Sequence, residues 1–144
     1  MTLSRDVGQP PYFVLIDRAY RDEGTSYHYL PPDEYSHADP MMVERLDGAF
    51  DHLTVSVERG AAWTTDAPFR ETAEAIRGRQ TDGILALEME AAALYAFARA
   101  RGKDVLCFAH VTNQMAQIHG DFEKGESDAL AVISAAVRAL GAGR

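Results

Sequence analysis

The segment that decides the fold runs from Leu85 to Tyr95 and reads LALEMEAAALY. Its apolar beginning predicts a short buried strand, and the alanine-rich residues after Glu90 predict a helix. Two carboxylates, Glu88 and Glu90, stand where the strand gives way to the helix. Open α/β sheets bind ligands at this carboxyl edge, and carboxylate oxygens accept hydrogen bonds from hydroxyl groups. The segment therefore predicts a strand–helix unit with a candidate site for a hydroxyl-bearing ligand.

The two glutamates also have a simpler interpretation. A negative charge at the N-terminus of a helix is favourable by ~0.3–1 kcal/mol. On a helix, Glu88 and Glu90 would point about 200° apart, whereas in an extended segment they would share a face. Both contact one ligand only if the backbone stays extended until the helix begins, so the residues leave both roles open.

Apolar runs and turn-forming residues mark the other strands. Strands are predicted at 12–16, at 53–57 with a continuation toward Trp63, at 84–87 and at 105–111. Residues 21–37 are rich in Gly, Ser, Pro, Asp and Tyr and predict a long loop, and residues 112–124 predict a polar connection.

Four helices are expected between these strands. The first opens at Asp39-Pro40, and a second runs from an N-cap at Asp66 to about Gln80. A third spans 91–101 and ends at Gly102. The last follows a cap at Ser127 and carries one apolar stripe, Leu130, Ile133, Val137 and Leu140. The alternation predicts a single domain over 1–144, a three-layer α/β/α fold with a mostly parallel mixed sheet.

Composition narrows the class of protein. The 144-residue chain is 47% hydrophobic and has a formal net charge of −8, which argues against binding to nucleic acid or to an anionic membrane. We expect a cytoplasmic protein, because no signal peptide or membrane span is visible and the one cysteine, Cys107, lies in an apolar run. The five histidines are scattered, so no metal site is expected.

Two further segments accompany Glu88-Met89-Glu90. Residues 21–29 read RDEGTSYHY, and residues 63–72 read WTTDAPFRET. In order and approximate spacing, the three motifs resemble those of the nucleoside phosphorylase superfamily, the purine nucleoside and uridine phosphorylases. The resemblance covers about residues 12–140 and is to the C-terminal part of the family only. It implies a phosphorylase/hydrolase-like fold that is truncated at its N-terminus.

The resemblance implies roles for the residues around the sugar. It makes Glu90 the acceptor of ribose hydroxyls and the stabiliser of an oxocarbenium-like sugar, and it packs Met89 on the ribose. Glu88 is a second ligand candidate if the segment is extended.

For the base, the resemblance implies stacking on an aromatic residue, either Trp63 or Phe69, with Arg70 donating to a base carbonyl. The residues themselves also allow an N-cap at Asp66 with an aromatic contact from Trp63 or Phe69. His28 is expected either to donate to the ligand or to close its loop.

One departure from the family bears on the substrate. Purine-specific relatives carry Ser-Asp after the strand that ends at Val111, where this chain has Thr112-Asn113. The Asn113 amide forms hydrogen bonds but is no general acid at neutral pH, which shifts the expected substrate toward uridine-type nucleosides.

The resemblance implies a nucleoside phosphorylase-like pentosyltransferase of nucleoside salvage, with phosphate as co-substrate and no cofactor. The family's glycine-rich and arginine-bearing phosphate segment is not recognised, so we expect no phosphate-dependent cleavage by this chain alone. The alternatives are an inactive nucleoside-binding or assembly protein and a phosphate-independent hydrolase. Expected partners are a riboside, further copies in a homo-oligomer, and a separately encoded N-terminal half.

Overall fold

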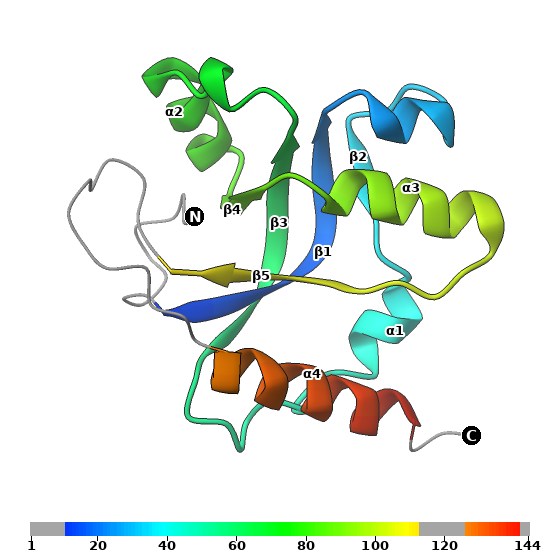
Figure 1. The fold of residues 1–144 in the computed structure, drawn as a ribbon, viewed down its shortest axis with the longest axis vertical. Coiled ribbons are helices and arrows are strands. Elements are labelled where there is room, and N and C mark those ends of the chain that lie inside the picture. The colour runs from blue at the N-terminus through cyan, green and yellow to red at the C-terminus, as the bar shows by residue number, and fades with distance from the viewer. Residues whose placement is uncertain (1–10, 113–125, 142–144) are drawn as a thin grey trace.

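A five-stranded mixed sheet forms the centre of the molecule in the computed structural model, which describes residues 11–112 and 126–141 (Figure 1). Its order is β2-β1-β3-β4, with β5 also paired to β1. Strands β1, β3 and β4 are parallel, whereas β2 and β5 run antiparallel to β1. The strands are β1 (Tyr12–Asp22), β2 (Tyr35–His37), β3 (Val57–Thr65), β4 (Ile84–Glu88) and β5 (Cys107–Val111).

Strand β1 holds the sheet together because it pairs with three neighbours. Its register with β3 shifts at Asp17, since Ile16 pairs with Gly60 and Arg18 pairs with Ala61. Such a bulge bends a strand. Before the bulge β1 pairs with β5, and after it β1 pairs with β2, so one long strand serves two antiparallel partners.

Helices cover both faces of the sheet. On one face, Ala62 and Ala86 pack in one core cluster with Tyr95 of α3. On the other face, Trp63 and Ile84 pack against Ile76 of α2. This alternation along β3 and β4 confirms the predicted α/β layering. The helices are α1 (Pro40–Glu44), α2 (Ala73–Thr81), α3 (Ala91–Arg101) and α4 (Glu126–Gly141), with 3-10 turns η1 (Thr25–His28) and η2 (Pro68–Arg70).

Two helix ends lie where the sequence predicted them, the start of α1 and the end of α3. The Asp39 carboxylate caps α1 by accepting from the backbone N–H of Met41 at 2.8 Å. Helix α3 ends at Gly102, whose φ of 59° is the left-handed conformation that glycine adopts at low cost.

Several boundaries differ from the prediction, and the strand expected at 12–16 extends to Asp22. The expected loop at 21–37 contains the end of β1, the turn η1 and the strand β2. The strand expected from 53 begins only at Val57, because the preceding residues form turns such as the one from Phe50 to Leu53. Helix α2 is capped by Thr72, not by Asp66, since η2 intervenes and the Asp66 carboxylate accepts from the backbone of Gly24.

The apolar stripe predicted on α4 faces outward. Leu130, Ile133 and Val137 are 67%, 52% and 63% exposed, whereas Val132 is fully buried. Ala135 and Ala136 are also buried on the inner side, with Leu140 partly buried against the core. The smaller residues allow the helix to approach its neighbours closely. The face of α4 that is buried is therefore opposite to the one that the periodicity of large apolar residues predicts. The side chain of the expected cap, Ser127, lies outside the described residues.

This orientation of α4 is testable with two matched substitutions. We expect Val132→Ala to lower the free energy of unfolding by about 1.5–2.5 kcal/mol, because it removes two buried methyl groups and leaves a cavity. Val137→Ala should change it by less than ~0.5 kcal/mol. Urea unfolding measures both, and a larger loss for Val137→Ala would reverse the assignment of the two faces.

Candidate functional site

The three sequence motifs meet at one edge of the sheet. Because β1, β3 and β4 are parallel, their carboxyl ends lie together, and each motif lies at one of these ends. The backbone N–H of Gly24 donates to the Asp66 carboxylate at 3.0 Å and joins the first motif to the second. The Thr64 hydroxyl donates to Glu88 and joins the second to the third.

The Glu88 carboxylate is built into the start of α3. One oxygen accepts the Thr64 hydroxyl, and the other accepts the backbone N–H groups of Glu90 and Ala91 at 2.7 Å each. Thr64 in turn accepts from the N–H of Ala92 at 3.0 Å. Three of the first N–H groups of the helix, which have no partner within a helix, are thus satisfied by side chains at strand ends. Burial raises the pKa of Glu88, although these hydrogen bonds favour its ionised form.

Glu90 is placed differently. It occupies the N-cap position of α3 but makes no capping hydrogen bond with its side chain, and its carboxylate is exposed. The contact described for that carboxylate is to the backbone N–H of Met89 at 3.2 Å. Strand β4 ends at Glu88, and the chain bends at Met89 before the helix begins. The helix-end role therefore belongs to Glu88, while Glu90 keeps free acceptor capacity.

Both glutamates line a cavity of about 250 Å³. The rest of its wall is apolar and comes from β1, from β5 with the residue before it, and from the first turns of α3. No basic side chain lines this cavity in the part of the chain that the structure describes. Carboxylate acceptors over an apolar wall suit a small ligand with hydroxyls along one side and carbon on the other. The remaining lining residues are Ile16, Ala91, Leu94, Leu106, Cys107 and Phe108.

Cys107 in this wall is held as a neutral thiol. Burial raises its pKa to about 12, and the nearby carboxylates of Glu88 and Glu90 act in the same direction. The hydroxyl of Tyr95 accepts from the backbone N–H of Cys107 at 3.0 Å and donates to the carbonyl of Ile16. This hydroxyl therefore ties α3 to β1 and β5 beside the cavity.

The residues considered for base contact lie in three places. Trp63 is buried on the α2 face and donates from its indole N–H to Asp22 at 2.9 Å. Phe69 in η2 is 98% exposed, and its neighbour Arg70 is exposed as well. His28 is exposed on η1, which packs against α3. Of the expected contacts, only Glu88 and Glu90 share the cavity; Asn113 lies outside the described residues.

Sequence reasoning missed the residues that organise the first motif. Arg21 is buried, and its guanidinium donates to the hydroxyl of Ser26 at 2.9 Å and to the carbonyl of Pro31 at 2.8 Å. It also lies over the ring of Tyr27, 4.3 Å from the centroid. Glu23 accepts from the backbone N–H of Ser26 at 2.9 Å. A charged pair followed by glycine and a hydroxyl residue was the available signal for this closed loop.

Comparison with known families identifies the class. The chain matches the phosphorylase superfamily over residues 5–142 and belongs to that superfamily. The resemblance drawn from the three motifs is thereby confirmed at the superfamily level, as is the α/β phosphorylase-like fold. A comparison with curated proteins finds none that matches the chain.

No helix among the described residues is long and apolar enough to span a membrane. They also contain no cluster of histidine, cysteine and acidic side chains suited to a metal ion.

Glu88 accepts hydrogen bonds at the start of α3, whereas the side chain of Glu90 does not cap this helix. Replacing each of them by alanine should therefore change the stability of the fold by different amounts. Glu88→Ala should lower the free energy of unfolding by ~2–3 kcal/mol, because it removes the acceptor of the buried Thr64 hydroxyl and of two N–H groups at the start of α3. Glu90→Ala should change it by less than ~0.5 kcal/mol. Thermal and urea unfolding of both variants measure the difference, and equal effects would show that Glu88 does not anchor α3.

The raised pKa of Cys107 predicts slow alkylation. At pH 8 we expect iodoacetamide to modify the native chain on the order of 10²–10³-fold more slowly than the urea-unfolded chain, since only the thiolate reacts. The native rate should keep rising with pH beyond 9, where the unfolded rate levels off. Mass spectrometry reports a single site, as the chain has one cysteine; similar native and unfolded rates would contradict the assignment.

Proposed function

We propose that this chain binds a nucleoside and cleaves its N-glycosidic bond. Uridine-type substrates are favoured over purine nucleosides. The observation that carries the proposal is the exposed Glu90 carboxylate at a small cavity on the carboxyl edge of the sheet. Membership of the phosphorylase superfamily supports the reaction class.

In this proposal Glu90 accepts hydrogen bonds from the ribose hydroxyls. Leu94 and Phe108 contact the carbon face of the sugar from the apolar wall. As the bond between the anomeric carbon and the base nitrogen breaks, its electron pair leaves with the base and positive charge develops on the sugar. A carboxylate in a partly desolvated cavity stabilises that charge.

Phosphate is the family's nucleophile, and it is placed by cations or by rows of backbone N–H groups. The described lining of the cavity supplies only carboxylates as charged groups, and the buried Arg21 is already engaged with its own loop. We therefore propose that this domain supplies the nucleoside half of the site, with phosphate held by groups outside the described residues.

The preference for pyrimidines rests on residue chemistry. An amide at Asn113 does not protonate a leaving purine at neutral pH. The exposed Phe69 offers its ring to a base, whereas the buried Trp63 packs in the core. Base stacking on an aromatic residue contributes ~1–3 kcal/mol in single-strand binding proteins.

Calorimetric titration with uridine and inosine tests the binding step. Glu90→Ala should weaken uridine binding by at least 10-fold, as expected for the loss of ~1.5–3 kcal/mol of hydrogen bonding to a charged group. The matched control is Glu44→Ala, which removes an exposed carboxylate at the end of α1 and should leave the affinity unchanged. Equal affinities of both variants would remove Glu90 from the site.

Product analysis tests the reaction. Ribose 1-phosphate formed only with phosphate identifies a phosphorylase, ribose formed without phosphate identifies a hydrolase, and binding without uracil release identifies a nucleoside-binding protein. We expect the chain alone to release uracil at least ~10³-fold more slowly than a phosphorylase whose site holds phosphate, because the described site does not position phosphate. Rapid formation of ribose 1-phosphate by the purified chain would contradict this account.

A further inference from the structure

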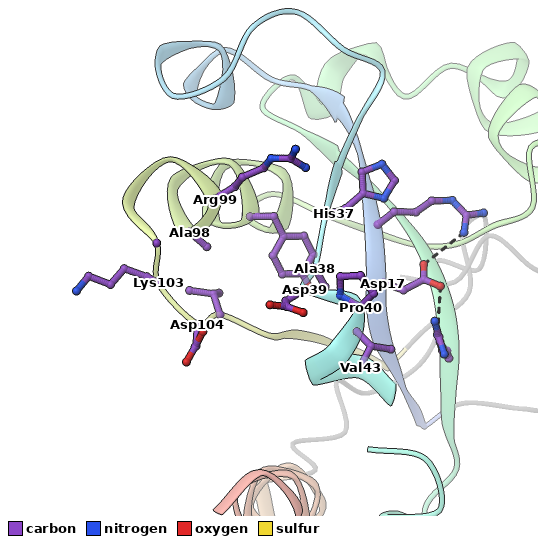
Figure 2. A pocket seen from close by; sticks show the side chains of 15 residues that line it. Asp17, His37, Ala38, Asp39, Pro40, Val43, Ala98, Arg99, Lys103 and Asp104 are labelled. Carbon is purple, nitrogen blue, oxygen red and sulfur yellow. Dashed lines mark hydrogen bonds and ion pairs between the residues drawn. The ribbon is translucent and has the colours of Figure 1, made fainter. Parts of the chain in front are cut away.

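A second and larger cavity lies at the other end of α3. Its volume is about 800 Å³, within the range of small-molecule sites, and Figure 2 shows the side chains around it. Its wall is formed by the C-terminal half of α3 with residues 102–105 after it, the segment from β2 to α1, the bulge of β1, and Arg59 of β3. Residues 91 and 102, which line the small and the large cavity, are about 16 Å apart along the helix.

Some charged side chains in this cavity form ion pairs and others do not. Asp17 at the bulge is shared by two guanidinium groups, with Arg18 and Arg59 each 3.4 Å from its oxygens. Arg99 and Lys103 form no ion pair within the described part of the chain. Cationic side chains outnumber carboxylates in the lining by one, although the whole chain carries a net charge of −8. The described lining of the cavity is thus less acidic than the chain as a whole, and the guanidinium of Arg99 is left available to an anionic group.

The charged side chains lie on two sides of the cavity. In Figure 2, the guanidinium of Arg99 extends along the side where His37 lies, whereas Asp39 and Asp104 lie on the opposite side, with Lys103 next to Asp104. One carboxylate oxygen of Asp39 accepts the N–H of Met41 at the start of α1, and the other oxygen is still able to accept a hydrogen bond.

The back of the cavity is apolar. Tyr95, Ala98 and Val43 are buried there and offer carbon surface between Arg99 and the carboxylates of Asp39 and Asp104. The ligand that fits has an anionic group at one end, hydroxyl donors at the other, and a carbon skeleton between them.

We propose that this cavity binds a phosphorylated sugar. Arg99 receives the phosphate, because a planar guanidinium matches two phosphate oxygens at once, and His37 lies on the same side. The sugar hydroxyls donate to Asp39 and Asp104, and the carbon face packs on Tyr95 and Ala98. The proposal is independent of the nucleoside site, which shares none of these side chains.

Isothermal titration of the full chain with ribose 5-phosphate tests the proposal. Arg99→Gln should weaken binding by at least 10-fold. The matched control is Arg101→Gln, which removes the same charge from the same helix end at an exposed position that does not line the cavity. It should change the affinity by less than 2-fold, and circular dichroism verifies that both variants fold.

Ligand fragments and a second variant complete the test. Ribose and inorganic phosphate should each bind at least 10-fold more weakly than ribose 5-phosphate, since each engages one side only. Glu90→Ala should leave ribose 5-phosphate binding unchanged. Equal effects of Arg99→Gln and Arg101→Gln, inorganic phosphate binding as tightly as ribose 5-phosphate, or loss of binding in Glu90→Ala would each overturn the proposal.

Discussion

At the carboxyl edge of the sheet, the Glu88 carboxylate accepts the Thr64 hydroxyl of β3 and two backbone N–H groups at the start of α3. These bonds fix the helix relative to both strands. An unsatisfied donor in such a position costs about 1–3 kcal/mol, so the arrangement is strongly preferred over a free helix end. Because Glu88 is committed to the helix, the chain bends at Met89, and the next carboxylate, Glu90, is presented to solvent at the small cavity.

Helix α3 connects two cavities of different chemistry. Tyr95 contributes to the wall of the large cavity, and its hydroxyl bonds to Ile16 and Cys107, which line the small one. The small cavity offers carboxylates alone as charged groups, whereas Arg99 provides the large one with an unpaired cation among the described residues. One buried tyrosine thus lies between the two cavities and contacts the walls of both.

Elements with strong local signals were predictable. The cap at Asp39 and the terminal Gly102 mark helix ends by hydrogen bonding and by backbone conformation, both of which depend on a few neighbouring residues. The start of α2 was not predictable. Asp66 contacts Gly24, which is 42 positions away in the sequence, and its carboxylate is therefore not available to cap the helix. The outward stripe of α4 was missed for a similar reason, since periodicity identifies an apolar face but not what covers it.

The amino-acid sequence by itself determined the alternation of strands and helices, the three motifs and hence the superfamily, because these depend on residue types and spacing. Tertiary structure alone decided which glutamate caps the helix and which is free, that Trp63 is buried while Phe69 is exposed, and that Arg99 lines a cavity. Parallel pairing of β1, β3 and β4 brings distant side chains to one edge, and the competition between burial and hydrogen bonding there assigns each its role.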